Sequence, residues 1–244
     1  MNEDTLLRDE RLRKYIEKAR NAPMVPAPRN DLEPEEARRN SRRFRELMLH
    51  RRSIRHYSER PVAWELVENA VRVACSAPSG ANQQPWTYVL VSDPEIKERM
   101  RAAIEAEEYA TYARRASDEW LEALAPLGTD WEKRHITDAP YVAIVFARIY
   151  GHLPAREGEP SAKIKHYYVA ESVGISVGFF LAALTQAGLA TLTHTPNPMG
   201  VLGSILKRPE NERCFVVIPI GYPADDARVP ALSKKSLDEA LVRL

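Results

Sequence analysis

The sequence predicts an α+β domain, in which strands and helices follow one another in irregular order. Three observations support this fold class. The chain has 244 residues, a length that one compact domain commonly reaches. Apolar residues make up 44% of it, which is enough to bury a core. Strand-like and helical segments alternate unevenly, unlike the repeating βαβ units of a parallel sheet.

The first 45 residues differ in composition from the rest and predict a charged helical arm. Three prolines are closely spaced between residues 23 and 28. A second helix is expected at residues 34–49, where a proline occupies the first turn. A short amphipathic helix precedes it, with an apolar side made of Leu6, Leu7, Leu12, Tyr15 and Ile16. Such an arm rarely folds alone, so we expect it to pack over the domain or over a partner subunit.

Residues 46–244 are predicted to form one globular domain that ends in an extension, residues 223–244. The first helix of this domain covers residues 62–75, where apolar residues recur at helical spacing and Pro78 prevents continuation. A strand is expected at residues 86–91, because β-branched and aromatic residues are concentrated there.

A long helix follows this strand. Asp93 and Pro94 form a cap and first-turn pair, and the helix continues to about residue 112. Residues 114–138 continue as charged helical segments, broken near Pro126 and Gly128. The remaining elements are strands at residues 141–147, 189–195 and 214–220, a core helix at 163–187 ended by Gly188, and a short helix at 199–206.

The charge balance excludes classes of protein that act through one long-range field. The sequence has 35 Lys and Arg against 34 Asp and Glu, a formal net charge of +1. A dedicated nucleic-acid binder normally carries a larger basic excess. No spacing of His, Cys or carboxylate residues indicates a metal site.

Residues 172–206 contain no charged side chain and raise the question of a membrane span. The apolar part is shorter than the about 20 residues that a spanning helix needs. We therefore expect a core helix, buried by protein on nearly all sides. The acidic start of the chain does not resemble a signal peptide, and Cys75 and Cys214 fit a reducing compartment. A cytoplasmic protein without a membrane anchor is expected.

Two segments contain residues suited to chemistry. Arg51, Arg52, Ser53 and Arg55 place three guanidiniums and a hydroxyl within five residues, a group that can bind phosphate. A solvated basic turn is the plain alternative. Residues 77–86 contain small side chains, which let a backbone approach a ligand closely. Without any precedent, this segment is simply a loop between a helix and a strand.

These segments, in this order, resemble the nitroreductase-type FMN flavoproteins. A basic Arg-Arg-Ser-x-Arg turn is followed by Ala-Pro-Ser-Gly-Ala and then by Pro-Trp-Thr leading into a strand. Within this superfamily the chain most resembles the iodotyrosine deiodinases. The similarity begins near residue 45 and includes Trp120, Trp131-Glu132-Lys133, His166-Tyr167-Tyr168, Leu181-Ala182-Ala183-Leu184, Ala187-Gly188-Leu189 and Gly221-Tyr222-Pro223.

The resemblance implies a mixed sheet flanked by helices in an intertwined homodimer, with FMN at each of two subunit interfaces. The extension at residues 223–244 would dock on the partner subunit. The residues that it implies for FMN binding are Arg51, Arg52, Ser53, Arg55, Ser79, Gly80, Thr193, His194, Thr195 and Lys234. Thr195 would donate at the flavin N5 and is the predicted catalytic residue. Lys234 stands where the family has an Arg, and Lys does not provide a bidentate fork.

The resemblance also implies the substrate. Glu108, Tyr112 and Lys133 would bind the zwitterionic end of a halotyrosine, and the Ala81 amide would bind its phenolate. Glu108 and Tyr112 are four residues apart and so share one helix face. The implied reaction is FMN-dependent removal of halide from 3-iodotyrosine or 3,5-diiodotyrosine, in one-electron steps from reduced flavin. The region between Glu108 and Lys133, broken and highly charged, would close as a lid.

Three alternatives remain open at this stage. An FMN nitroreductase or quinone reductase using NAD(P)H would share the flavin residues without needing the zwitterion set. A basic module could bind nucleic acid through the arginines at residues 38–55, although the net charge weakens that reading. A flavin carrier without catalysis is the third. Because no dinucleotide fingerprint is present, the electron donor is either an unidentified flavin reductase or NAD(P)H.

Overall fold

A computed structural model of the chain describes residues 10–153, 161–196 and 198–244. The chain forms two compact units, Met1–Arg43 and Phe44–Leu244. In the first unit, helix α2 (Glu10–Arg20) contains the predicted apolar residues from Leu12 onward, whereas Leu6 and Leu7 lie outside the described residues. Helix α3 (Pro34–His50) begins at the predicted proline and continues into the second unit.

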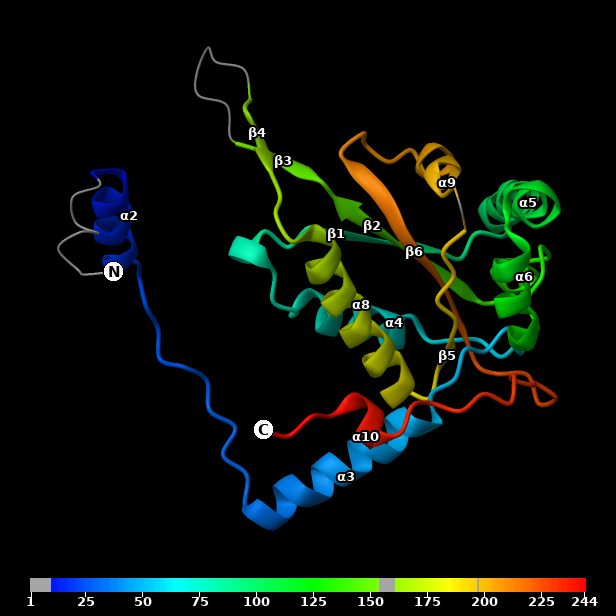
Figure 1. The fold of residues 1–244 in the computed structure, drawn as a ribbon, viewed down its shortest axis with the longest axis horizontal. Coiled ribbons are helices and arrows are strands. Elements are labelled where there is room, and N and C mark those ends of the chain that lie inside the picture. The colour runs from blue at the N-terminus through cyan, green and yellow to red at the C-terminus, as the bar shows by residue number, and fades with distance from the viewer. Residues whose placement is uncertain (1–9, 154–160, 197) are drawn as a thin grey trace. The chain divides into compact units, whose positions relative to one another are not determined.

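A four-stranded sheet forms the centre of the second unit, in the order β1-β2-β6-β5 (Figure 1). Neighbouring strands are antiparallel, and their bounds are β1 (Trp86–Val91), β2 (Tyr141–Arg148), β6 (Glu212–Gly221) and β5 (Ala190–Thr191). Among the described residues, one isolated bridge to this sheet is parallel and joins Ser53 to Thr191, so the sheet is mixed. The α+β fold class is confirmed.

Helices cover both faces of this sheet, so the sheet is a middle layer. Side chains alternate across a strand: Ala143 and Val145 of β2 face one cluster of buried residues, and Ile144 and Phe146 face another. The first face is covered by α4 (Trp64–Cys75) and α8 (Val169–Gln186), and the second by α5 (Pro94–Ala110) and α9 (Gly200–Ile205).

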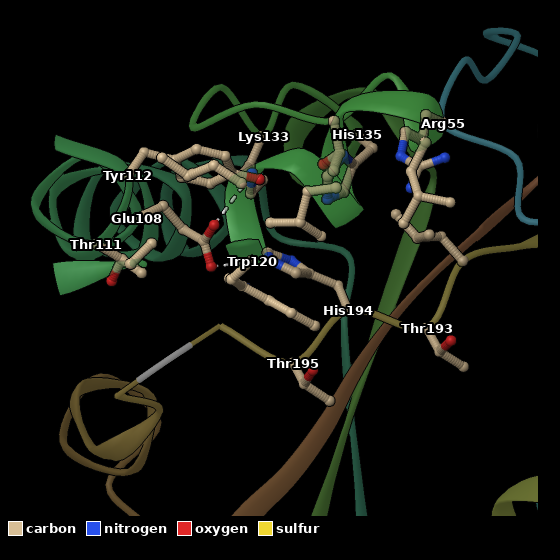
Figure 2. Close-up of a pocket in the computed structure, with 16 residues that line it drawn as sticks. Arg55, Glu108, Thr111, Tyr112, Trp120, Lys133, His135, Thr193, His194 and Thr195 are labelled. Atoms are coloured by element: carbon tan, nitrogen blue, oxygen red, sulfur yellow. Dashed lines mark ion pairs between the residues drawn. The ribbon is translucent and has the colours of Figure 1, made fainter. Parts of the chain in front are cut away.

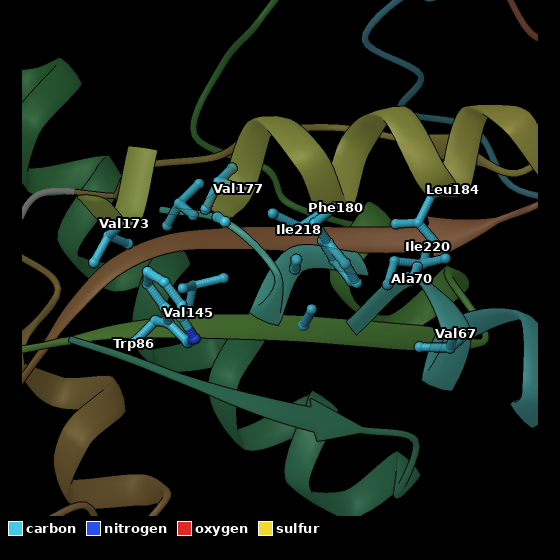
Figure 3. Close-up of a cluster of buried hydrophobic side chains, with 14 of the residues drawn as sticks. Val67, Ala70, Trp86, Val145, Val173, Val177, Phe180, Leu184, Ile218 and Ile220 are labelled. Atoms are coloured by element: carbon cyan, nitrogen blue, oxygen red, sulfur yellow. The ribbon is translucent and has the colours of Figure 1, made fainter. Parts of the chain in front are cut away.

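Figure 3 shows the first cluster, in which α8 lies over the sheet. Phe180 of α8 is 0% exposed, and its ring centroid lies 5.1 Å from that of Tyr88. Burial of one such side chain stabilises a fold by about 1.5–3 kcal/mol. Because a slip of one residue would turn every apolar side chain of a strand to the opposite face, the cluster also fixes the register.

The core helix begins later than predicted. The sequence predicted helix from residue 163, but Lys163–Lys165 is strand β4, which pairs with β3 (Tyr150–His152). The backbone then turns at Tyr168, whose φ of 52° is left-handed, and α8 begins at Val169. A three-residue strand shows too little alternation for the sequence to distinguish it from the first turn of a helix.

The predicted strand at residues 189–195 is regular only at its start. Regular pairing stops at Thr191, and the chain rejoins β6 through an isolated bridge between His194 and Val217. Pro196 lacks the amide hydrogen that further pairing would require. The other predicted strands and helices from residue 34 to residue 112 and beyond residue 196 agree with the structure to within one or two residues at each end.

In the described part of the chain, α8 is the helix whose length and hydropathy would allow a membrane span. One side of it packs on the sheet, as expected for a core helix. The prediction that α8 is buried on nearly all sides is wrong for the single chain, because Ile175 and Phe179 are 43% and 40% exposed. The sheet can cover only one side of a helix, so the other side stays open.

Short helical turns connect the larger elements. They are η1 (Gly80–Asn82), η2 (Thr111–Arg115), α6 (Asp118–Leu124), η3 (Ala125–Leu127), α7 (His135–Asp138) and α10 (Leu237–Ala240). The predicted break near Pro126 and Gly128 is confirmed, because η3 contains the proline and Gly128 ends it with a left-handed φ of 58°.

Candidate functional site

A cavity of about 500 Å³ lies between the segment after β5 and the helical turns that follow α5. Figure 2 shows the Lys133 and His194 side chains directed at Glu108 from parts of the chain that are far apart in sequence. Seven predicted site residues line the cavity: Arg55, Glu108, Tyr112, Lys133, Thr193, His194 and Thr195. The fold therefore brings the residues predicted to bind the zwitterion (Glu108, Tyr112 and Lys133) close to residues 193–195, which were predicted to contact the flavin.

The end of α5 places two of these side chains. Asp93 caps the helix by accepting a hydrogen bond from the Ile96 amide at 2.9 Å, so α5 begins where the sequence predicted. After Ala110 the helix widens into the π-helical turn η2, a feature that recurs at functional sites. Glu108 and Tyr112 both line the cavity, as their spacing predicted.

Two nitrogen-bearing side chains lie beside the carboxylate of Glu108. Lys133 Nζ lies 3.3 Å from Oε2, and His194 Nε2 lies 3.5 Å from Oε1; Figure 2 marks both pairs. Burial alone would raise the pKa of Glu108, but the imidazole of His194 and the ammonium of Lys133 outweigh it, so the pKa lies below its ordinary value. The carboxylate is therefore ionised at neutral pH.

The chain around Lys133 is tied to α5. Glu105 Oε1 accepts hydrogen bonds from the Lys133 amide at 2.7 Å and from Arg101 Nε at 2.8 Å. The Lys133 ammonium donates to the Asp130 carbonyl and lies 5.5 Å from the centre of the Tyr112 ring. Only 3% of the Lys133 side chain is exposed. The ammonium is thus fixed beside Glu108 and Tyr112 before any ligand arrives.

The contact between two histidines in this cavity was not predicted, because the sequence analysis named His194 only for FMN binding and did not name His135. The ring of His135 lies edge-on to that of His194, with centroids 5.3 Å apart. Among the described residues, neither ring nitrogen of His194 has a hydrogen-bond partner, and Nε2 of His135 also has none. Burial lowers the pKa of His135 to about 3. Burial also lowers the pKa of His194, although Glu108 opposes that change. Both rings are neutral at neutral pH.

A second cavity, of about 450 Å³, lies beside the arginine turn. Arg51, Arg52, Thr191 and Gly188 are among its lining residues. The Ser53 bridge to Thr191 and a 3.0 Å hydrogen bond from the Ile54 amide to the Thr191 carbonyl hold this turn at the edge of the sheet. A pair of guanidiniums on a fixed turn suits an anion such as phosphate.

Ser79, Gly80 and Ala81 lie at a different place. The Gly80 amide donates to Ser172 Oγ at 3.3 Å, which puts this loop near the start of α8. Gly188, just past the end of α8, lines the arginine cavity. Since α8 has 18 residues, and a helix rises about 1.5 Å per residue, the loop and the arginine turn do not meet within one chain. Lys234 is exposed and lines neither cavity.

Residues 48–222 match the model of the Nitroreductase family. The chain belongs to the nitroreductase family. It is 50% identical over 218 residues to the iodotyrosine deiodinase of Haliscomenobacter hydrossis, an alignment that covers 89% of this chain and 95% of that relative. It is 43% identical over 221 residues to the iodotyrosine deiodinase of Nematostella vectensis, covering 89% of this chain and 82% of the other.

A solved structure agrees with this assignment. A crystal structure of oxidized iodotyrosine deiodinase bound to FMN and 3-iodo-L-tyrosine superimposes on this chain with a TM-score of 0.66. The two sequences are 28% identical, and the alignment covers 82% of this chain and 97% of the other. The expected family resemblance is therefore confirmed. The roles of the individual site residues stay predictions, because the relatives establish the family and not the function of each side chain.

Proposed function

We propose that this nitroreductase-family protein is an FMN-dependent iodotyrosine deiodinase. The convergence of Glu108, Tyr112 and Lys133 on one cavity with Thr193 and Thr195 supports the proposal most directly. A general nitroreductase needs the hydroxyl-bearing segment but has no use for a buried carboxylate and ammonium beside it. The similarity to deiodinases, one of them solved with FMN and 3-iodo-L-tyrosine, supports the same activity.

The residues present fit FMN. Arg51, Arg52 and Ser53 would hold its phosphate, because guanidiniums and a hydroxyl form charge-assisted hydrogen bonds to phosphate oxygens. The chain from Thr191 at the arginine cavity to Thr195 at the zwitterion cavity spans about 13 Å if extended. One flavin nucleotide could therefore run beside this segment, with Arg55 at the polar edge of its ring and the Thr195 hydroxyl at N5.

The zwitterion cavity would bind the amino-acid end of the substrate. The ionised Glu108 would accept hydrogen bonds from the ammonium group, and the Tyr112 hydroxyl and Lys133 ammonium would donate to the carboxylate. These contacts orient the halogenated ring. The region from η2 to Lys133 would act as the lid, since Trp120 and Trp131 on it are 57% and 39% exposed and have apolar surface available to cover a ligand.

When bound in its reduced form, FMN would supply two electrons, in one-electron steps. The carbon–iodine bond would break and iodide would leave with the electron pair of that bond, while the two flavin electrons and one proton would form the new carbon–hydrogen bond, so that iodotyrosine becomes tyrosine. The protein residues would hold the ring as a phenolate through the Ala81 amide, keep the amino-acid end fixed and exclude water. Thr195 would donate a hydrogen bond at N5, which favours one-electron over hydride transfer.

Because the Ala81 loop and the arginine turn lie near opposite ends of α8, a site that uses both needs two subunits. We propose a homodimer in which the loop of one subunit completes the site of the other. An apolar groove of about 540 Å³ supports this assembly. It lies along the open side of α8 and α4, and includes Phe44, Leu66, Val73 and Phe179. Contiguous apolar surface of this kind marks an interface.

The C-terminal extension would dock on the partner in the same assembly. Its start is anchored within the chain, because the Arg52 guanidinium donates to the Pro230 carbonyl. Its end carries apolar side chains that the described chain leaves open, since Leu237 and Val242 are 70% and 80% exposed. A second subunit would cover them, and Lys234 would reach the flavin from there.

An anaerobic experiment tests the proposed activity. The purified FMN-loaded protein is reduced with dithionite, 3-iodotyrosine is added, and flavin reoxidation and free iodide are followed together. We expect one iodide for each flavin reoxidised, and no reoxidation with tyrosine as the control. If 3-iodotyrosine causes neither reoxidation nor iodide release, the deiodinase assignment is wrong, although the family assignment stands.

A further inference from the structure

The direction of the His194 side chain is fixed by its backbone. The His194 amide donates to the Val217 carbonyl at 2.9 Å, and the Val217 amide donates to the His194 carbonyl at 2.8 Å. Successive side chains of an extended segment point to opposite sides. Thr193 and Thr195 are accordingly exposed, whereas only 12% of the His194 side chain is. Figure 2 shows the imidazole directed at Glu108, away from both threonine hydroxyls.

The contacts of Glu108 indicate what this imidazole does during substrate binding. Glu108 Oε2 faces the Lys133 ammonium and Oε1 faces His194 Nε2. A substrate ammonium would have to approach the Glu108 carboxylate. Lys133 would then have to donate one of its hydrogen bonds to the substrate carboxylate. During that exchange, a fixed donor on Oε1 is the group that keeps the Glu108 side chain in place.

We infer that His194 is a positioning residue for substrate binding, whose neutral imidazole donates from Nε2 to Glu108 Oε1 and holds that carboxylate for the substrate ammonium. This inference rests on the proposed function and goes beyond it, because it assigns one residue of the segment to the substrate and its two neighbours to the flavin. The separation of 3.5 Å between His194 Nε2 and Glu108 Oε1 is at the limit of hydrogen bonding, and it would shorten when the substrate ammonium displaces Lys133.

The charges around the imidazole explain why it has to be neutral. The groups that face it are Glu108 from α5, Lys133 and His135 from the segment entering α7, and Arg55 from the arginine turn. The charges of Glu108 and Lys133 cancel, and a bound zwitterion adds no net charge. A protonated His194 would add a cation next to the substrate ammonium and compete with it for Glu108. Burial and the two nearby cations oppose that protonation.

A plain structural role for His194 makes a different prediction. If the ring only filled space between Glu108 and His135, its loss would weaken every ligand of the cavity to a similar extent. A positioning role instead affects ligands that carry an ammonium group. Comparing 3-iodotyrosine with 2-iodophenol separates the two, because iodophenol has the halogenated ring and phenol without the zwitterion.

The experiment measures dissociation constants of both ligands for the oxidised FMN-loaded protein, by quenching of flavin fluorescence between pH 5 and pH 8. The variants are His194→Leu, which removes the donor, and His194→Gln, whose amide nitrogen restores a donor that does not titrate. His152→Gln, at the exposed end of strand β3, is the matched control. Iodide release by the reduced wild-type protein is measured in parallel, and its absence would count against the proposed function itself.

For His194→Leu we expect the affinity for 3-iodotyrosine to fall about tenfold or more, the effect of losing a hydrogen bond to a charged group, with iodophenol little changed. His194→Gln should recover most of that loss. Because burial lowers the pKa of His194 below its ordinary value, the wild-type preference for 3-iodotyrosine over iodophenol should decline only toward the acidic end of this pH range, whereas in His194→Gln it should stay level.

Several results would overturn the inference while leaving the deiodinase activity intact. One is a preference for 3-iodotyrosine that is unchanged in His194→Leu; another is an equal loss of both ligands. If His194→Leu does not fold, the pH series decides alone. Wild-type and His194→Gln proteins with the same decline in preference at low pH would then exclude titration of His194 as its cause and reject the role proposed for the neutral ring.

Discussion

Replacement of Glu108 by Gln tests the proposed zwitterion site most directly. The change removes one charge and keeps the size of the side chain. In the structure, Glu108 Oε2 lies 3.3 Å from Lys133 Nζ. At that separation two unit charges in a surrounding of effective dielectric constant about 20 attract by about 5 kcal/mol. A substrate ammonium at the same carboxylate would experience an attraction of similar size, reduced by the loss of its hydration.

The net cost of removing one member of a buried charged pair is about 2–5 kcal/mol. The dissociation constant of 3-iodotyrosine should therefore rise about 30- to 5,000-fold in Glu108→Gln. Binding of 2-iodophenol should change by less than about threefold, because it makes no ammonium contact. Fluorescence titration of the oxidised flavoprotein measures both constants, and iodide release under saturating 3-iodotyrosine shows whether the chemical step survives.

Glu107→Gln is the matched control. Glu107 lies next to Glu108 on α5, pairs with Arg115 at 2.8 Å and is 38% exposed, so its removal should leave both affinities unchanged. Thermal unfolding of each variant guards against a folding defect, since Glu108→Gln also leaves the buried Lys133 without its partner. Equal losses of both ligands in a folded Glu108→Gln protein would refute the assignment of this carboxylate to the substrate ammonium.

Four further changes test other parts of the structure. Thr195→Ala should shift the separation of the two one-electron potentials of bound FMN by about 20–65 mV; an anaerobic titration with 3-iodotyrosine present that finds no shift removes its N5 role. Phe180→Ala, at a fully buried position, should lower the free energy of unfolding by about 3–5 kcal/mol, and urea denaturation showing under 1 kcal/mol would contradict the packing. Burial raises the pKa of Glu212 but Arg208 outweighs it, so the pKa is lowered. Its stabilisation is fully present above the unfolded pKa of about 4.5 and is lost as the pH falls through the lower folded pKa, and Glu212→Gln should flatten the fall in Tm from pH 5 to pH 3. Burial raises the pKa of the Cys214 thiol to about 12, so a thiol reagent should label it only after unfolding.

Local patterning was enough to predict most of the helices and strands. Asp93 and Pro94 define the start of α5 because a side-chain cap and a fixed proline φ act within a few residues. Strand β1 agrees with the prediction at both ends, since its apolar run is bounded by Pro85 and Asp93. In contrast, Lys163–Lys165 was wrongly predicted as helix, because its strand conformation depends on pairing with Tyr150–His152.

The candidate site was predictable only where a resemblance supplied the residues. The zwitterion set was named in this way, and the fold brings all of its side chains into one cavity. The contact of His194 with Glu108 and with His135 was not predicted, because these residues come from three separate elements that only the fold brings together. The distance between the Ala81 loop and the arginine turn was also hidden, since the length of α8 separates them in space.

The pairing of Glu108 with Lys133 accounts for how the cavity tolerates charge both without and with substrate. Without substrate, the two buried charges satisfy each other, and the pair adds no net charge to the interior. A bound zwitterion would replace the Glu108–Lys133 pair by two pairs, in which Glu108 meets the substrate ammonium and Lys133 meets the substrate carboxylate. The net charge of these four groups would still be zero. A ligand with only an ammonium or only a carboxylate would leave an uncompensated charge beside these buried side chains. Selection for an intact amino acid would thus follow from charge balance as much as from shape, and it depends on His194 and His135 remaining neutral.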